Sequence, residues 1–316
     1  MESKIRLGVS SCLLGEPVRF DGGHKHDRYL TGTLGRYVEF VPVCPEVELG
    51  LPTPRETLRL VGSSEDQRLV FSKSGEDITD RMTAWSDMRV RQLEQENLSG
   101  FIFKSRSPSS GMARVKLYDQ NGSPNPRGVG VFARIFMEHF PTLPVEEDGR
   151  LHDPRLRECF IEAIFVFGRW RKLLEEGLTI GRLVDFHTRH KLLILSHSVE
   201  TYREMGRLVA AAKTLSLKDL GERYQTLLMK AMRLKSTPAK NINVLMHALG
   251  YFKKELTADE KQEVLEQIEN YRQGHFPLIV AVTLLNHFIR KYDKSYLRDQ
   301  FYFAPHPLEL QLRNHV

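Results

Sequence analysis

Three short loops in the first 115 residues carry side chains that could do chemistry, and each loop follows a strand-like hydrophobic run. The first holds Cys12, the second holds Cys44 and Glu46, and the third, residues 104–111, holds hydroxyls and cations. Thiolates are nucleophiles and metal ligands, carboxylates can carry protons, and a Ser/Gly-rich backbone suits phosphate oxygens. Because loops at the carboxyl ends of neighbouring strands converge in an open α/β sheet, we expect one reactive centre.

Each thiol also has a structural interpretation, since free cysteine is usually a small buried hydrophobe. Cys12 and Cys44 follow strands and lie beside Gly15 and Pro45, which favours a ligand or a nucleophile. Cys159 instead lies in a helical pattern with apolar neighbours on its own face, which favours packing in a core.

The third loop offers Lys104 and Arg106 as cations for a substrate phosphate. It lacks the lysine pattern of a Walker loop, and the chain has no dinucleotide-binding fingerprint, so a nucleotide cofactor is not indicated. Glu46 is a single loop glutamate of a kind that is ordinarily solvated. Its interpretation as a proton carrier therefore depends on its neighbours.

The elements that must position these loops alternate in type. Short apolar runs at 5–9, 38–43, 68–72 and 101–103 are separated by helix-compatible stretches, notably 79–97. This alternation predicts an α/β domain with a mostly parallel sheet. We expect residues 129–136 to close the domain as its last apolar element, and the acidic stretch 141–154 to be a linker.

Long helical periodicities begin after Pro154 and predict an all-α C-terminal domain. The domains are thus expected at 1–145 and 146–316. The expected helices are 155–175, 179–212, 216–235, 239–255, 258–272, 276–292 and 294–300.

Composition indicates a soluble globular protein, with 41% hydrophobic and 27% charged residues among 316. We expect no membrane span and no signal peptide, and three scattered cysteines suit reduced thiols in the cytoplasm. The net charge of +6 is uneven: residues 1–150 carry 20 Lys+Arg against 21 Asp+Glu, and residues 151–316 carry 26 against 19. The C-terminal excess is expected if that domain meets a polyanion.

The helical domain offers two candidate binding features. His187, His190 and His197 share one helical face and could bind a metal, although a buried helix or a face toward an acidic partner is favoured. Basic residues interleaved with aromatics suit phosphate contact and base stacking, or else form a solvated basic surface. The RNA-binding candidates are Arg189, His190, Lys191, Lys253 and Lys254.

Four motifs give residues 4–140 a resemblance to the thiouracil and 4-thiouridine desulfidase family. They are Ser11–Gly15, Arg19–Gly22, Cys44–Glu46 with Gly50–Arg55, and Lys104–Pro108. The remainder resembles a helical domain of the YbgA-like type that is often fused to the first. Its motifs are Phe186–Lys191, Asn243–His247 and Tyr251–Lys254.

The resemblance implies a 4Fe–4S cluster that is held by three cysteines, with one iron open to the substrate sulfur. It assigns proton transfer to Glu46 and orientation of substrate or water to Ser107. The implied function is a cytoplasmic desulfidase that converts 4-thiouridine in tRNA to uridine and sulfide without net redox change.

One position departs from the family pattern. The family's third loop reads Ser-Pro-Ser-Cys-Gly, whereas this chain has Ser110 at the third cluster position, beside Cys12 and Cys44 as the other two. A serine hydroxyl has a much higher pKa than a thiol, so the cluster is expected to bind poorly or to be absent. The change is either engineered or natural, or else Cys159 moves in, which its apolar setting disfavours.

The sequence is also compatible with two other functions. One is desulfidation of free thiolated nucleotides or nucleobases. The other is a non-catalytic RNA-binding protein with a degenerate cluster site, for which Ser110 is the main support.

Overall fold

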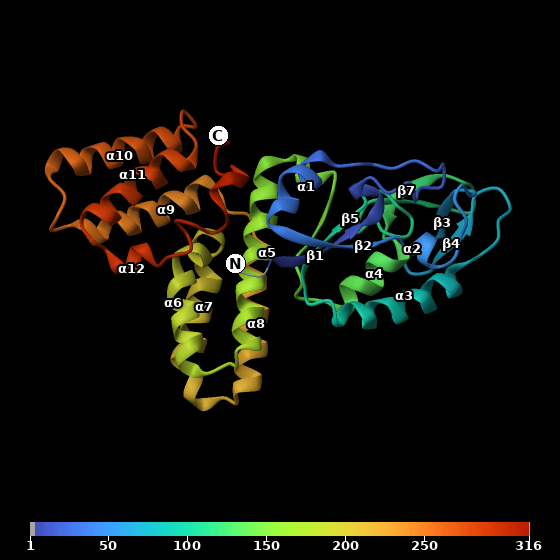
Figure 1. The fold of residues 1–316 in the computed structure, drawn as a ribbon, viewed down its shortest axis with the longest axis horizontal. Helices are drawn as coiled ribbons and strands as arrows, with labels where there is room; N and C mark the ends of the chain where they lie inside the picture. The colour runs from blue at the N-terminus through green and yellow to red at the C-terminus, as the bar shows by residue number, and fades with distance from the viewer. Residues whose placement is uncertain (1–3, 316) are drawn as a thin grey trace. The chain divides into compact units, whose positions relative to one another are not determined.

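Sheet A consists of four parallel strands in the order β2-β1-β5-β8 in the computed structural model, which describes residues 4–315 (Figure 1). Its strands are β1 (Ile5–Ser10), β2 (Val38–Val43), β5 (Leu98–Phe103) and β8 (Val145–Glu147). All six residues of β5 are buried, as expected for a central parallel strand covered on both faces. The predicted α/β domain with a mostly parallel sheet is confirmed.

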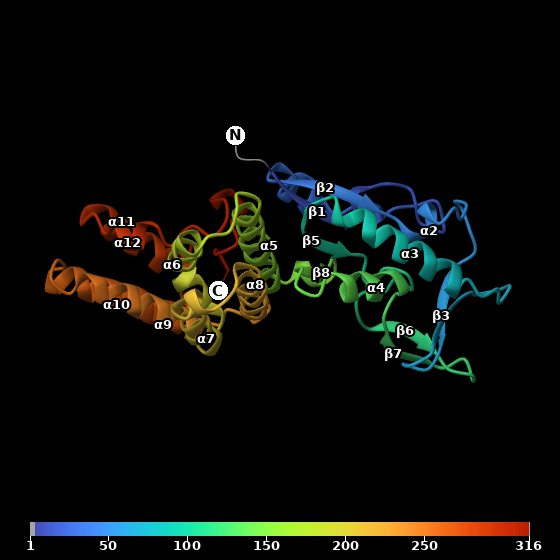
Figure 2. The same ribbon diagram turned by 90° about the horizontal axis from the view of Figure 1, so that it is seen from below.

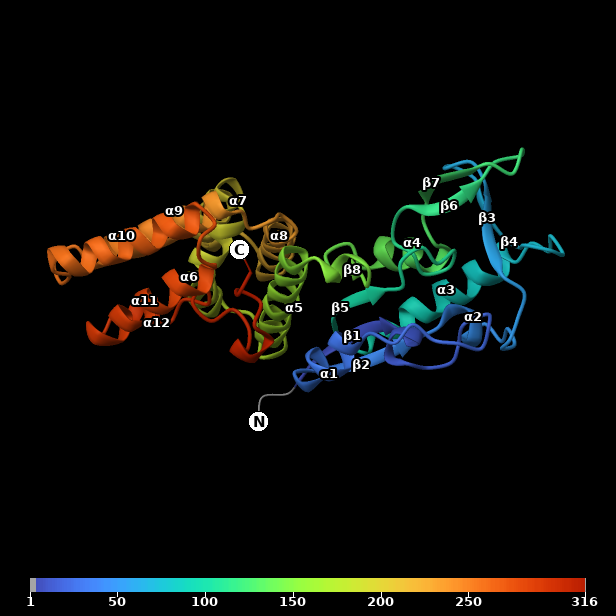
Figure 3. The same cartoon turned by 90° about the horizontal axis from the view of Figure 1, so that it is seen from above.

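Helices α3 (Thr79–Glu94) and α4 (Val131–His139) pack side by side against sheet A (Figures 1 and 3). Two shorter helices, α1 (Arg28–Gly32) and α2 (Pro45–Glu48), lie in the loops beyond β1 and β2. Phe101 of β5 meets Phe136 of α4 with ring centroids 4.7 Å apart. A Cβ at Gly8 of β1 would lie 2.2 Å from the Phe101 ring, so only glycine lets that ring pack there.

A second sheet, sheet B, is set apart from sheet A (Figure 2). Its strands are β3 (Leu58–Gly62), β4 (Gln67–Phe71), β6 (Val115–Tyr118) and β7 (Pro124–Gly128), in the order β4-β3-β6-β7. The apolar run at 68–72 was expected in the parallel sheet, and that expectation is wrong. The short Ser63–Asp66 turn returns β4 antiparallel to β3, because a turn of this length cannot make a parallel crossover.

The segment expected to be a linker is part of the first unit. Val145–Glu147 forms β8 and pairs with β5, so the chain divides into Met1–His152 and Asp153–Val316. The boundary between the two units therefore lies after His152 and not after residue 145, because β8 completes sheet A. The last apolar element at 129–136 belongs mainly to α4, which begins at Val131.

The second unit is helical throughout its secondary structure, as predicted. Its helices are α5 (Pro154–Glu175), α6 (Ile180–His197), α7 (Val199–Ala210), α8 (Leu217–Met232), α9 (Pro238–Leu249), α10 (Ala258–Arg272), α11 (Leu278–Lys291) and α12 (Ser295–Arg298). The expected helix 179–212 is interrupted at Ser198, whose backbone is extended and whose hydroxyl caps α7 by accepting from the Thr201 N–H. Trp170, Phe186 and Tyr224 pack together in the core.

Candidate active site

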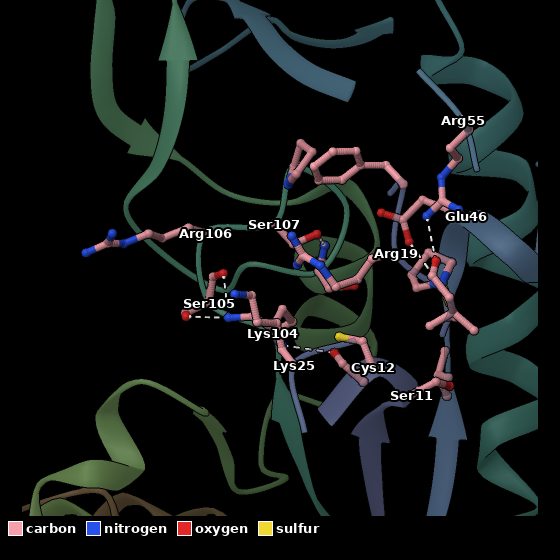
Figure 4. A pocket seen from close by; sticks show the side chains of 18 residues that line it. Ser11, Cys12, Arg19, Lys25, Glu46, Arg55, Lys104, Ser105, Arg106 and Ser107 are labelled. Carbon is pink, nitrogen blue, oxygen red and sulfur yellow. Dashed lines mark hydrogen bonds between the residues drawn. The ribbon is translucent and has the colours of Figure 1, made fainter. Parts of the chain in front are cut away.

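The loops that follow β1, β2 and β5 surround one cavity of about 320 Å³ in the first unit (Figure 4). These strands are neighbours in sheet A, and their carboxyl ends lie at the same edge. The structure therefore brings together the predicted site residues of this unit. They are Cys12, Cys44, Glu46, Lys104, Arg106, Ser107 and Ser110.

Cys12 lies in the single 3-10 turn Ser11–Leu14 directly after β1. Its carbonyl accepts a hydrogen bond from the Lys25 N–H, which fixes the turn against the chain that returns toward α1. Burial raises the pKa of the Cys12 thiol to about 11, although the nearby Lys104 charge opposes this. The thiol is therefore protonated at neutral pH unless a metal displaces its proton.

Cys44 and Glu46 form the second wall of the cavity. Cys44 ends the extended chain of β2 and precedes Pro45, the first residue of α2, and its N–H donates to Oε1 of Glu48. The Cys44 thiol lies 3.6 Å from Oε2 of Glu46, toward which it donates. Burial, together with the Glu46 carboxylate, raises the pKa of Cys44 to about 12.

Serines of the third loop connect Glu46 to the rest of the site. The Ser109 hydroxyl donates to Oε1 of Glu46 at 2.6 Å, and the Ser107 hydroxyl lies 2.9 Å from the Ser109 oxygen. Since Ser109 donates its only hydroxyl hydrogen to Glu46, Ser107 must be the donor in the second bond. The Ser110 N–H in turn donates to the Ser107 hydroxyl. Ser107 thus reaches the carboxylate through Ser109.

Ser109 was missed by the sequence interpretation, which singled out Ser107. The loop contains four serines, Ser105, Ser107, Ser109 and Ser110, and nothing in their order shows which one meets the carboxylate. Ser109 is fully buried. The contact depends on the fold of the loop and not on residue type.

The third loop is held by the beginning of α4. The carbonyls of Pro108 and Ser109 accept hydrogen bonds from the N–H groups of Val131 and Ala133. A Cβ at Gly130 would lie 2.5 Å from the Ser109 carbonyl, so glycine is required for this approach. The helix start therefore fixes the loop that carries Ser109 and Ser110.

Lys104 is held by an acidic partner that the sequence interpretation assigned to a linker. Its ammonium lies 2.8 Å from Oδ2 of Asp148, and both side chains are largely buried. Burial alone would raise the pKa of Asp148, but hydrogen bonds from Lys104 and Ser105 outweigh it and lower that pKa. Lys104 lines the cavity as a positioned cation.

The other cations of the cavity differ in their placement. Arg106 is exposed and has a left-handed backbone with φ of 62°, and its side chain extends away from Cys12 and Glu46 (Figure 4). Arg19, Lys25 and Arg55 also line the cavity, although none was named as a site residue from the sequence. Arg19 and Arg55 lie in the motifs that carry the family resemblance, and this position could have identified them as site residues from the sequence.

The donors present do not fit a cluster that requires three thiolates. Cys12, Cys44 and the buried Ser110 supply two thiols and one hydroxyl around the cavity. Between residues 4 and 315, no group of three His, Cys, Asp or Glu side chains could hold a metal ion. Cys159, the remaining thiol, belongs to α5 of the helical unit. Iron–sulfur clusters are normally held by thiolates, so we assign no step to a cluster in this chain.

The three histidines of α6 do not form a metal site. His187 meets the Tyr224 hydroxyl, and His197 meets Glu162 and the Leu234 carbonyl. His190 is fully buried, where its ring bonds the Phe186 carbonyl and receives the Arg169 Nε–H. The prediction that His190 contacts RNA is wrong, because the hydrophobic packing of α6 removes its ring from solvent.

The remaining predicted RNA contacts lie in the helical unit and stay predictions. Arg189, Lys253 and Lys254 are exposed, and Lys191 is half-buried. The Arg189 guanidinium lies over the Phe301 ring, 4.7 Å from its centroid, so part of its surface is already used within the unit. Lys253 and Lys254 follow the 3-10 turn Gly250–Phe252 beyond α9.

Comparison with known families gives one match for each part of the chain. The family model of 2-thiouracil desulfurase matches residues 7–148, and that of a protein of unknown function, DUF1722, matches residues 191–307. None of the helices in the described part of the chain is long and apolar enough to cross a membrane.

Individual proteins each match part of the chain. The chain is 34% identical over 161 residues to the uncharacterized protein YbgA of Escherichia coli, covering 51% of this chain and 95% of that protein. It is 31% identical over 108 residues to the uncharacterized protein YbbK of Bacillus subtilis, covering 33% of this chain and 71% of that one. A solved [4Fe-4S]-dependent thiouracil desulfidase is 29% identical, covers 48% of this chain and 95% of its own, and superimposes with a TM-score of 0.39.

Proposed function

Because the chain belongs to the 2-thiouracil desulfurase family through residues 7–148 and joins this domain to a DUF1722 domain, we propose that it is a tRNA 4-thiouridine desulfidase whose activity is limited by Ser110. The thiolated base would enter the cavity of the first unit. The helical unit would hold the tRNA. One observation carries the proposal: the loops after β1, β2 and β5 place two thiols and a carboxylate around a single cavity, with the buried Ser109 holding the carboxylate.

The charge of the cavity supports a nucleotide as substrate. Five cationic residues line it, and Glu46 is the single acidic residue among its lining. The cations are Arg19, Lys25, Arg55, Lys104 and Arg106. Phosphate oxygens of RNA are bound by such cations. The volume of about 320 Å³ is at the lower end of the range for small-molecule sites, which suits one nucleoside.

The reaction is a hydrolysis at C4 of the base. A water oxygen bonds to C4, the C4–S bond breaks, and sulfur leaves as sulfide while the ring keeps a carbonyl oxygen. Glu46 would take a proton from the attacking water at Oε2, the oxygen that faces the Cys44 thiol. Ser109, held by the beginning of α4, would fix the carboxylate through Oε1. Ser107 would orient the water or the base.

The solved relative is described as [4Fe-4S]-dependent, and such a cluster supplies a thiophilic iron when it is bound. Ser110 occupies the position at which this family chemistry needs a third thiolate. We therefore expect the unaltered chain to bind the thiolated base while releasing sulfide slowly or not at all.

The test compares the unaltered chain with Ser110→Cys, both prepared without oxygen. We expect Ser110→Cys to hold about four irons and to release sulfide from 4-thiouridine-containing tRNA, and the unaltered chain to do neither. Ser105→Cys, which adds a thiol elsewhere on the cavity wall, is the matched control and should resemble the unaltered chain. Equal sulfide release by the unaltered chain would disprove the limiting role of Ser110. No release from either protein would disprove the desulfidase proposal.

Ser110 also favours a second function, a non-catalytic RNA-binding protein. Its hydroxyl lies at the cavity wall where the family chemistry needs a third thiolate, and binding without catalysis needs no cluster. Tight binding of thiolated tRNA without sulfide release by Ser110→Cys would select this function. Use of free 4-thiouridine monophosphate as readily as tRNA would indicate a free nucleotide as the substrate.

A further inference from the structure

The helical unit contains a second cavity, of about 200 Å³, that no step of the proposed reaction uses. It is lined by residues at the start of α5, at the start of α9, at the end of α10 and at the start of α11. All of these elements belong to the one unit. The cavity therefore exists whether or not the first unit catalyses desulfidation.

Two arginines line this cavity. Arg155 lies in the first turn of α5 and is exposed, and Arg272 is the last residue of α10. Arg272 pairs with Glu269 at 3.1 Å, but both side chains are about half-exposed, so this pair is weak and exchangeable. His315 also lines the wall, but burial lowers its pKa and its ring lies 3.3 Å from Glu158, so it is not counted among the cations.

The start of α9 adds the positive end of a backbone dipole. Thr237 there makes no side-chain capping bond, and its neighbour Ser236 lines the cavity. The start of α11 is different, because the Ile279 N–H already donates to the Arg313 carbonyl. The first N–H groups of a helix have no partner within the helix and favour an anion. The start of α5 differs, because the Asp153 carboxylate already caps it.

A buried hydroxyl in the wall supplies a further donor. Tyr271 is 9% exposed, and its oxygen accepts a hydrogen bond from Nδ2 of Asn241 at 3.3 Å. Among the described residues, no acceptor pairs with the hydroxyl hydrogen of Tyr271. Tyr271 lines the cavity, so its hydroxyl can donate to a ligand oxygen there while it continues to accept from Asn241.

The acidic residue in the wall does not oppose an anion. Glu158 receives Nε–H of Arg313 at 3.2 Å and lies 3.3 Å from Nε2 of His315. Burial and the neighbouring Glu162 carboxylate raise the pKa of Glu158, and both of its carboxyl oxygens are already paired within the wall, with Arg313 and with His315. The positive groups open to an anion in the cavity are therefore Arg155, Arg272 and the start of α9.

We propose that this cavity binds the phosphate of a nucleotide, with Arg155, Arg272 and Tyr271 as its ligands. Phe276 is 42% exposed at the rim and offers an apolar surface for the base. A volume of about 200 Å³ has room for a phosphate with its sugar, while a longer RNA would continue outside. The nucleotide is either free or part of an RNA chain.

The experiment measures binding to the full chain by calorimetry. The probes are uridine 5′-monophosphate, uridine and a short 5′-phosphorylated RNA. Arg155→Gln/Arg272→Gln is compared with Arg223→Gln/Arg290→Gln, a control that removes two exposed arginines elsewhere in the unit. Tyr271→Phe tests the hydroxyl without removing a charge, and circular dichroism checks that each variant is folded.

We expect the monophosphate to bind the unaltered chain more tightly than uridine. The cavity variant should weaken this binding at least tenfold, Tyr271→Phe should weaken it severalfold, and the control should change it less than twofold. If only the RNA binds, and the cavity variant still loses it at least tenfold, the nucleotide belongs to an RNA chain. Binding that is the same in the cavity variant and in the control would overturn the proposal, as would no binding of any probe by the unaltered chain. Sulfide release plays no part in either result.

Discussion

The Ser109 hydroxyl donates a 2.6 Å hydrogen bond to Oε1 of Glu46, and this bond joins the loop after β5 to the loop after β2. The same carboxylate presents Oε2 to the Cys44 thiol. Two adjacent strands thus position one carboxylate from two sides. The orientation of Glu46 depends on a residue 63 positions further along the chain.

Ser109→Ala should destabilise the first unit by about 1.5–3 kcal/mol, because it removes a buried hydrogen bond to a charged group. In the Ser110→Cys background it should also lower turnover by about tenfold, equivalent to about 1.4 kcal/mol. Urea unfolding and sulfide release measure the two effects. Ser123→Ala, at an exposed turn, is the control. Turnover that survives despite lower stability would show that Ser109 supports the fold alone.

Glu46→Gln in the Ser110→Cys background should keep the iron content and reduce sulfide release by at least about 100-fold, as expected for loss of a proton carrier. Glutamine keeps the shape of the side chain and can still accept from Ser109. Exposed Glu65→Gln is the control and should leave both quantities unchanged. Undiminished sulfide release would exclude Glu46 from proton transfer.

Asp148→Asn should destabilise the first unit by about 1.5–3 kcal/mol, because the Lys104 ammonium would lose a charged partner in a largely buried position. Asp87→Asn, on the exposed face of α3, should have little effect. Urea midpoints of the two variants provide the comparison. Equal midpoints would mean that solvent replaces Asp148 as the partner of Lys104.

The helical unit should be acid-sensitive through Glu162. Burial opposes ionisation of this carboxyl, but hydrogen bonds from His197 at 2.9 Å and Arg313 at 2.8 Å lower the pKa of Glu162 to about 2. A lowered folded-state pKa stabilises the fold above the unfolded value of about 4.3, and this stabilisation is lost as the pH falls toward 2.

Glu162→Gln should therefore cost about 1.5–3 kcal/mol at neutral pH, since it removes one charged partner of the buried Arg313, which keeps its ion pair with Glu158. The difference in stability between the unaltered chain and this variant should shrink as the pH falls from 4.5 to 2. Thermal unfolding across this range measures the difference, with exposed Glu263→Gln as the control. A difference that is constant with pH would show that Glu162 is not ionised in the folded chain.

Lys253→Gln/Lys254→Gln should weaken tRNA binding and reduce its salt slope by about 2, if both lysines contact phosphates. Lys172→Gln/Lys218→Gln removes the same charge from exposed positions on α5 and α8 and should change the slope less. Filter binding at several salt concentrations measures both slopes. Equal slopes in the two variants would place the RNA elsewhere on the unit.

The sheet and the convergence of its loops could be predicted from the sequence, because buried parallel strands such as β5 appear as continuous apolar runs. β8 could not be predicted, because it has three residues and two of them are glutamates. Glu146 and Glu147 are nevertheless buried. Their burial depends on pairing with β5, a contact between distant parts of the chain.

The candidate site was predictable in its residue types but not in its contacts. Cys12, Cys44 and Glu46 follow strands, and their position alone placed them at one edge. The order of the serine contacts and the Asp148 partner of Lys104 required the folded loops. The RNA contact predicted for His190 also failed on a contact that only the fold shows, since packing against Phe186 buries its ring.

The position of β8 affects the order in which the first unit can fold during synthesis. Strands β1, β2 and β5 leave the ribosome first. The strand that pairs with β5 and the counter-ion of Lys104 follow only with residues 145–148. Until then, the nascent unit exposes an unpaired strand edge and an unpaired ammonium group at its reactive cavity. Because domains generally fold as units as they emerge, the first unit can be completed only when the ribosome has reached the start of the helical unit.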